Sequence, residues 1–496
     1  MSNRGNYKNA KDRRATYLVF LLAAAVRIFW HIYTSYTADD AFITFRYADN
    51  IANGLGFVYN VGENVMGTST PLFALILSLL SLTGIKPILG ALFVSLISTG
   101  LTAVIIYRFA KLLSFKKYSI LPVVIFILFP RIISTDTGGM ETPLFALLVI
   151  AAFYYQRRKM PQVALYLSGL AVLTRPEGLF LFAIIFGRNI FSNISKTVKM
   201  AVISLLPVAA WLVFSQIYFG SIIPHSIPAK LALYSQFGTM SFWDSIVFLM
   251  GWHNLFGIAM FILALVGAHW LYHQKRFGLL ELIWMAAMIL FYAAGKTHLF
   301  LWYITPIYPV YILIALAAVP YLCEKFEWSR DNSRLSAIIF ASLAVVILLY
   351  ANYRPLESFK NQQTTHEEIH KSIGEYLKFH AGLNDLIAAE DIGYIGYYSE
   401  KHLLDRDGLV SPQAVPYNRD GRYLEFILDY NPDWVVASPQ SEISGFLKDD
   451  LFAERYEVVE WFISPSKLVY NLYRVTGTSI DEITRGDLRI SKMYLE

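Results

Sequence analysis

Apolar segments long enough to cross a lipid bilayer recur through the first 350 residues of this chain. A hydrocarbon core about 30 Å thick needs roughly 20 mostly apolar residues per helix. Backbone polar groups find no water in that layer, so each segment is expected to be helical. The chain is therefore predicted to be an α-helical polytopic membrane protein. Eleven candidate spans lie at 15–34, 87–107, 118–133, 142–156, 162–174, 178–190, 200–219, 246–271, 279–295, 299–322 and 335–351.

Composition agrees with a membrane protein. The 496 residues are 56% hydrophobic and 16% charged, whereas an average soluble domain is roughly 25% charged. The net charge of +5 comes from basic residues scattered in small clusters, which argues against a nucleic-acid partner. The single cysteine, Cys323, excludes an intrachain disulfide.

The distribution of Lys and Arg sets the predicted orientation. With the N-terminus in the cytoplasm, 20 of these residues in the leader and the loops lie inside and six lie outside, as the positive-inside rule requires. Counting 70–85 as a twelfth span would move Arg108 to Lys117 outside, so this stretch is interpreted as an interfacial or re-entrant helix of the external loop 35–86. The chain is predicted to be multi-pass in the cell inner membrane, with residues 352–496 in the periplasm.

Residues 352–496 have the pattern of a small α/β domain. An amphipathic helix is expected at 366–380, and strands are expected at 386–389, 434–437, 456–463 and 468–475. Two motifs, EDIGYIG at 390–396 and DRDGL at 405–409, are interpreted as structural turns, with acceptor binding or lid formation as the alternative.

Two adjacent acids follow the first predicted span. Asp39 and Asp40 precede apolar residues at helical spacing, which predicts a helix lying in the membrane interface with its carboxylates at the N-terminal end. One of the two acids could simply cap this helix. A cap does not account for both acids, and a carboxylate there could accept a proton from a sugar hydroxyl.

The external loop resembles that of bacterial GT-C glycosyltransferases, in particular the terminal arabinofuranosyltransferases of mycobacterial cell-wall arabinan. The resemblance is strongest over 36–85 and 135–180 and fainter to residue 310. It implies a GT-C-like transmembrane glycosyltransferase domain at 1–351, a C-terminal extracytoplasmic domain at 352–496 and a polyprenyl-phosphate sugar as donor. The motifs that carry it are DDAFITFRYA at 39–48, NGLGFVYN at 53–60, GE at 62–63 and GTSTPL at 67–72.

By this match an acid of the first external loop is catalytic, and Asp40 is favoured over Asp39. The motif GGMETP at 138–143 is similar to the family's second external acidic motif, which makes Glu141 a candidate second carboxylate. Its alternative is a favourable position at a helix N-terminus. Arg175 in LTRPEG at 173–178 is a candidate for the donor phosphate, because a guanidinium binds phosphate in a bidentate manner. An ion pair with Glu177 that closes the loop is the alternative.

Other candidates lie on later external segments. Lys230, in FGSIIPHSIPAK at 219–230, and Arg46 could neutralise phosphate, although a lone external lysine is often only solvated. His225 occupies a position where the family often has Asn. The remaining substrate-binding candidates are Glu177, His298, Trp302 and Tyr303, of which the two aromatic residues could instead belong to the interfacial belt.

The resemblance implies transfer of a sugar from polyprenyl phosphate to a cell-envelope glycan, lipid or protein acceptor on the extracytoplasmic side. The expected partners are this donor, membrane lipids and the acceptor, without nucleic acid. No cofactor is required. A divalent cation bridging acids and phosphate is known in some relatives, but the His/Cys ligand spacings of a zinc site are absent. The alternatives are a transporter or lipid-linked glycan flippase, a ligase with a pyrophosphate-linked donor, and a non-catalytic sensor.

Overall fold

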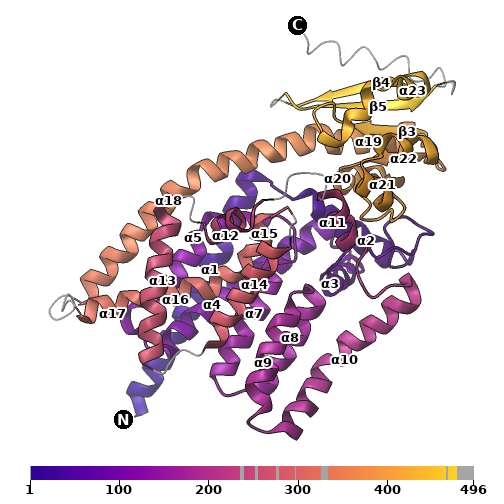
Figure 1. Cartoon of the computed structure of the whole chain (residues 1–496). Helices are drawn as coiled ribbons and strands as arrows, with labels where there is room; N and C mark the ends of the chain where they lie inside the picture. Colours follow the sequence, from indigo (N-terminus) through magenta and orange to yellow (C-terminus); the bar gives the residue numbers. More distant parts are fainter. Residues whose placement is uncertain are drawn as a thin grey trace.

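The computed structural model describes residues 2–234, 240–251, 255–274, 279–295, 298–325, 333–464 and 467–476. It shows a large helical bundle with a smaller domain at one end (Figure 1). The part of the predicted periplasmic domain after residue 476 falls outside these residues. The first part comprises α1 (Ser2–Thr34), α2 (Asp39–Ala52), α3 (Pro71–Ser81), α4 (Pro87–Leu112), η1 (Lys116–Tyr118), α5 (Leu121–Leu128), α6 (Pro130–Thr137), α7 (Thr142–Arg157), α8 (Pro161–Thr174), α9 (Gly178–Ile190), α10 (Ile194–Phe219), α11 (Ser226–Tyr234), α12 (Phe242–Met250), α13 (Leu255–His273), α14 (Leu279–Ala294), α15 (Leu301–Ile304), η2 (Thr305–Ile307), α16 (Tyr308–Leu316), α17 (Ala318–Lys325) and α18 (Ser333–Thr365).

Every predicted span coincides with one or more of these helices. By length and composition, five helices of the described chain could each cross a membrane, or six if the bent pair at 116–137 is one span. Four further apolar helices are shorter, among them α3 and α8. The helical membrane fold is thus confirmed, whereas the count of eleven spans stays a prediction.

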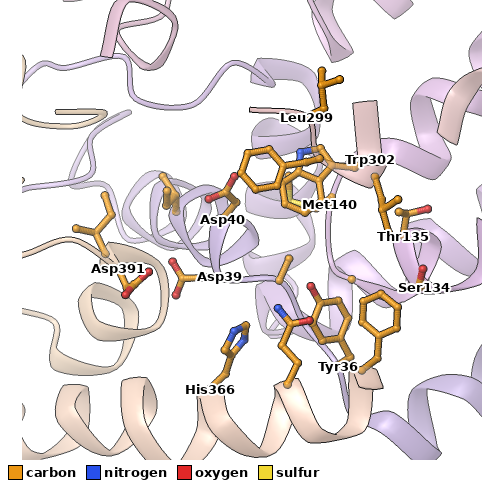
Figure 2. A pocket seen from close by; sticks show the side chains of 18 of the residues that line it. Tyr36, Asp39, Asp40, Ser134, Thr135, Met140, Leu299, Trp302, His366 and Asp391 are labelled. Atoms are coloured by element: carbon orange, nitrogen blue, oxygen red, sulfur yellow. The ribbon is translucent and has the colours of Figure 1, made fainter. Parts of the chain in front are cut away.

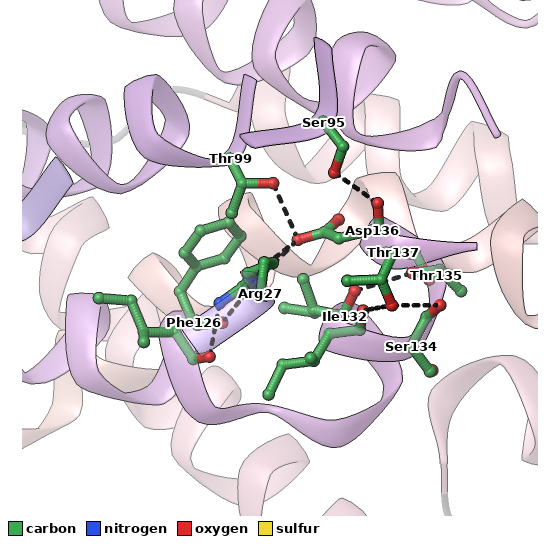
Figure 3. A network of polar contacts seen from close by, with 12 residues as sticks. Arg27, Ser95, Thr99, Phe126, Ile132, Ser134, Thr135, Asp136 and Thr137 are labelled. Atoms are coloured by element: carbon green, nitrogen blue, oxygen red, sulfur yellow. Dashed lines mark hydrogen bonds and ion pairs between the residues drawn. The ribbon is translucent and has the colours of Figure 1, made fainter. Parts of the chain in front are cut away.

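The bend between α5 and α6 is stabilised by Arg27, the charged residue inside the first span (Figure 3). Pro130 has no N–H to donate to the carbonyl of Phe126, so the helix breaks there. Arg27 donates to the carbonyls of Phe126 and Ile127 at 3.3 and 2.6 Å, and pairs with Asp136 at 2.9 Å. Arg27 therefore replaces backbone bonds lost at the break.

Helix α2 differs from the prediction of a helix lying in the membrane interface. All residues from Ala41 to Ala48 are buried. One side packs on α3 and α4, and α20 of the C-terminal domain covers another. The helix is thus a buried layer between the bundle and that domain.

The C-terminal domain is built on a five-stranded sheet of order β2-β1-β3-β5-β4. Strands β2 and β3 run parallel to β1, while β5 is antiparallel to β3 and β4. The predicted strands are confirmed; β2 is an additional one, and the predicted boundary at 351/352 falls inside α18. The elements are η3 (His366–Lys371), α19 (Ser372–His380), β1 (Leu386–Ala389), α20 (Ile392–Ser399), β2 (His402–Asp405), α21 (Ala414–Asp420), α22 (Tyr423–Tyr430), β3 (Trp434–Ala437), η4 (Glu442–Lys448), α23 (Asp450–Arg455), β4 (Tyr456–Ile463) and β5 (Val469–Val475).

Helices cover both faces of this sheet. Successive strand residues point to opposite faces: Ile387 packs in one hydrophobic cluster with Ile395 of α20, and Ala388 packs in another with Phe426 of α22. Helix α20, which connects β1 to β2, thus lies on the face toward α2, and α22, which precedes β3, lies on the opposite face.

Candidate active site

Two adjoining cavities meet at Asp40, between the bundle and the C-terminal domain, and Figure 2 shows the larger of the two. The larger has a volume of about 450 Å³ and the smaller about 90 Å³. Ile43, Met140, Trp302 and Leu409 line both, together with Asp40. The larger cavity includes Asp39, whereas the smaller includes Glu141, Arg175 and Lys230, so the structure gathers candidates that lie far apart in the sequence, such as Asp40 and Lys230, 190 positions apart.

Asp40 is the carboxylate that faces both cavities. Its Oδ2 lies 3.3 Å from the Nζ of Lys230 on α11, and the side chains are 31% and 22% exposed. The N-cap of α2 is Ala38, and neither Asp39 nor Asp40 makes a capping hydrogen bond there. Asp40 is therefore available to a ligand, with one cation beside it.

Asp39 turns toward the C-terminal domain instead. Its carboxylate accepts hydrogen bonds from the backbone N–H groups of Gly393 and Tyr394, at 3.0 and 2.9 Å, in the first turn of α20. Burial, and then the nearby carboxylate of Asp391, raise the pKa of Asp39 to about 8. The two adjacent acids thus have different partners, and Asp39 joins the bundle to the C-terminal domain.

Arg175 is held in a buried cluster at the smaller cavity. Its guanidinium lies 3.4 Å from Glu141 and 3.0 Å from Glu177, and it donates to the Tyr292 hydroxyl and to the carbonyl of Trp302. The alternative prediction of an Arg175–Glu177 pair is thus observed. Glu141 and Arg175 line the cavity, but Glu177 lies behind Arg175, also bonded to the Tyr292 hydroxyl, and does not line it.

Arg46 does not line either cavity. Its guanidinium donates to the carbonyls of Gly396 and Lys401, at 2.7 and 2.6 Å, and stacks over the ring of Tyr59. These carbonyls lie at the C-terminal end of α20, where a cation is favourable. Arg46 thus secures the C-terminal domain, and we do not assign it to the donor phosphate.

The remaining predicted residues divide into two groups. Trp302 and Tyr303 line the cavities, and Trp302 stacks on Phe300 with ring centroids 4.4 Å apart. His298 is exposed and stacks beside Tyr234. His225 does not line the cavities, whereas its neighbour Ser226 does.

The C-terminal domain supplies a wall of the larger cavity, which includes acids of the two motifs for which acceptor binding was the alternative to structural turns. Glu390, Asp391 and Asp407 follow β1 and β2, and His366 begins η3, directly after α18. Figure 2 shows Asp391 beside Asp39 and His366 below them. The acids belong to the motifs interpreted as turns, and their position directly after strands was the available signal.

These residues do not fit the metal suggested by the resemblance. Within the described ranges, no group of three or more His, Cys, Asp or Glu side chains is arranged to hold a metal ion.

Comparisons with known proteins identify the fold. A family model described as a domain of unknown function (DUF8728) matches residues 351–480. A search of curated protein sequences finds no match. Among solved structures, ArnT from Cupriavidus metallidurans bound to undecaprenyl phosphate is 13% identical, with a TM-score of 0.60 over 93% of this chain and 99% of that chain. An Archaeoglobus fulgidus oligosaccharyltransferase, in complex with Zn and sulfate, is 13% identical, with a TM-score of 0.52 over 91% and 72%.

The chain therefore shares the fold of these two solved structures, which is the fold that the resemblance predicted. This identification includes both the helical bundle and the small sheet domain. The narrower resemblance to arabinofuranosyltransferases stays a prediction.

Proposed function

We propose that this protein is a glycosyltransferase of the inner membrane that transfers a sugar from a polyprenyl-phosphate donor to a cell-envelope acceptor on the periplasmic side. The observation that carries the proposal is the position of Asp40, a partly exposed carboxylate paired with Lys230 at the junction of two cavities. The similarity to ArnT, solved with undecaprenyl phosphate, supports the lipid class of the donor.

The smaller cavity suits the donor phosphate. Arg175 and Lys230 both line it, and each can make charge-assisted hydrogen bonds to phosphate oxygens. Glu141 and Glu177 fix the guanidinium of Arg175, so little reorganisation is needed when the donor binds. Glu177 is thus a positioning residue, and Trp302 and Tyr303 provide apolar walls for the sugar.

Asp40 acts as the general base in the larger cavity. Its carboxylate removes the proton from an acceptor hydroxyl as that oxygen forms a bond to the anomeric carbon of the donor sugar. The bond between that carbon and the phosphate oxygen breaks, and polyprenyl phosphate leaves with its negative charge stabilised by Lys230 and Arg175. No nucleotide takes part.

Purified protein incubated with radiolabelled polyprenyl-phosphate sugars and a membrane-derived acceptor fraction tests this function. Transfer of label together with release of polyprenyl phosphate is expected. A flippase or sensor would release none, and a ligase would require a pyrophosphate-linked donor. Absence of release from every donor tested, by protein shown to be folded, would refute the proposal.

A further inference from the structure

A third cavity lies at the carboxyl edge of the sheet in the C-terminal domain. Its volume is about 380 Å³, and it is called the acidic cavity below. It shares four residues with the larger cavity of the candidate active site, so the two adjoin. The acidic cavity is lined by Leu233, Tyr234, Glu390, Asp391, Asp407, Ser438, Gln440, Ser441, Leu468 and Tyr470.

The topology of the sheet marks this edge as a binding position. Strands β2, β1 and β3 are parallel, and their carboxyl ends are followed by Asp407, Glu390 and Ser438 respectively. The helices that follow β1 and precede β3 lie on opposite faces, so the strand order reverses beside β1. In open α/β sheets, ligands bind outside the carboxyl ends of strands at such a point.

Glu390 carries an acceptor atom without a donor. Its side chain is 9% exposed, and its Oε2 accepts a hydrogen bond from Ser441 at 2.9 Å and lies 3.6 Å from Arg406. Its Oε1 has no hydrogen-bond partner within the described part of the chain. Because an unpaired buried acceptor costs free energy, this atom indicates a ligand that donates a hydrogen bond.

The connected cavities differ in charge, because Asp40 and Glu141 balance Lys230 and Arg175 in the smaller cavity, whereas the acidic cavity has acids alone among the charged residues of its described lining. The described lining of the acidic cavity includes three carboxyl groups, those of Glu390, Asp391 and Asp407, and neither Lys nor Arg. The smaller cavity includes Arg175 and Lys230. Burial, and then the carboxyl groups of Asp405 and Glu390, raise the pKa of Asp407 well above its ordinary value, so this carboxyl can donate a hydrogen bond as well as accept one. An anionic ligand would be repelled here.

We propose that the acidic cavity is the acceptor subsite, and that it selects a saccharide whose hydroxyl or ammonium groups donate to Glu390, Asp391 and Asp407 and which carries no carboxylate or phosphate there. This inference rests on the proposed glycosyltransferase function. The donor phosphate then lies in the smaller cavity, the acceptor in the acidic cavity, and Asp40 between them. Tyr234 and Tyr470 offer rings against which sugar faces pack.

Binding of three tetrasaccharides of equal length tests the selectivity. Chitotetraose is neutral, its fully deacetylated form carries ammonium groups, and tetragalacturonate carries carboxylates. With the full chain in nanodiscs at low salt, the first two are expected to bind, and tetragalacturonate to bind at least about tenfold more weakly than either. Equal or tighter binding of tetragalacturonate would overturn the proposal.

Substitution of single acids tests whether the acidic cavity causes this selectivity. Asp391→Asn is expected to weaken binding of the deacetylated tetramer by about fivefold or more, and it leaves the Glu390–Arg406 pair intact. Glu390→Gln should act in the same direction. Glu454→Gln, an exposed acid of α23 outside the cavity, is the matched control and should bind as wild type. Unchanged binding by Asp391→Asn would contradict the assignment.

Asp40→Asn separates this proposal from the proposed function. It should bind the three tetrasaccharides as wild type does while transferring no sugar. Loss of selectivity in a protein that still transfers sugar would overturn the acceptor subsite alone. Retained selectivity in a wild-type protein that releases no polyprenyl phosphate from any donor would overturn the glycosyltransferase function alone.

Discussion

Two acid–base pairs of the same chemistry lie in different surroundings. Arg27 and Asp136 are 2.9 Å apart inside the helical bundle, with side chains 0% and 3% exposed. Lys230 and Asp40 are 3.3 Å apart at the cavities, with side chains 22% and 31% exposed. The first pair is closed to a ligand, whereas the second is open to one.

The partners of each pair explain the difference in role. Arg27 also donates to carbonyls freed by the break at Pro130, and Asp136 accepts a hydrogen bond from Thr99 at 3.1 Å (Figure 3). Other groups of the chain therefore supply the hydrogen-bond partners of this pair. The side chains of Asp40 and Lys230 can still form hydrogen bonds with a ligand in the cavities. A buried charge such as Arg27 therefore does not by itself identify an active site.

The largest effect on stability is expected from Asp136→Asn. It leaves the Arg27 charge unpaired in the bundle, which typically costs about 3–5 kcal/mol. Thermal unfolding of the detergent-solubilised protein would measure this as a marked loss of melting temperature. The double variant Arg27→Met/Asp136→Leu should recover part of the loss, because it removes both charges. A wild-type melting temperature for Asp136→Asn would show that the pair does not hold the bend.

Lys230→Met tests the open pair. It removes a cation from the phosphate end of the cavities, so the KM for the donor is expected to rise about 10- to 100-fold, consistent with a charged hydrogen bond of about 1.5–3 kcal/mol. Lys230→Arg should retain most donor affinity. Lys86→Met, an exposed lysine of the same external region outside the cavities, is the control. A wild-type KM in Lys230→Met would remove this residue from the donor site.

Asp39→Asn tests the contact between the bundle and the C-terminal domain. The pKa of Asp39 is raised to about 8 by burial and by Asp391, so the folded protein holds a proton that the unfolded chain releases above about pH 4. Stability should therefore fall as the pH rises from about 4 to about 8. The groups around it are Asp40, Asp391 and His370. Melting temperatures from pH 5 to 8 should show a flatter slope in Asp39→Asn; an unchanged slope would contradict the assignment.

The smallest effect is expected at the half-exposed pair of Glu63 and His402. These side chains are both 37% exposed and lie 3.1 Å apart, joining the segment between α2 and α3 to the C-terminal domain. Surface pairs of this kind contribute about 0–1 kcal/mol. Glu63→Gln should thus change the melting temperature by no more than a few degrees, and a loss as large as that of Asp136→Asn would invalidate the comparison.

The fold was predictable where the residues of one segment determine it. Apolar length indicated every helix of the predicted spans, and short strand-like runs indicated β1, β3, β4 and β5. β2 was missed because His402–Asp405 has polar residues at both ends and only two apolar residues between them. The burial of α2 was also missed, since its cover, α20, lies about 350 residues away in sequence.

The candidate site was predictable in part for the same reason. The resemblance selected Asp40, Glu141, Arg175 and Lys230, which the structure brings together around the smaller cavity. It could not separate Asp39 from Asp40, because only the contact with Gly393 and Tyr394 distinguishes these neighbours. Arg46 was assigned to phosphate because the sequence did not reveal its actual partners. These are carbonyls of the C-terminal domain, 350 and 355 residues away along the chain.

The most direct measurement is sugar transfer by Asp40→Asn, compared with wild type and with Asp39→Asn. Asp40→Asn should lose about 10²- to 10⁴-fold in kcat, the usual contribution of a general base, while keeping the wild-type melting temperature and donor binding. Polyprenyl phosphate release at the wild-type rate from Asp40→Asn would contradict the assignment of the catalytic base.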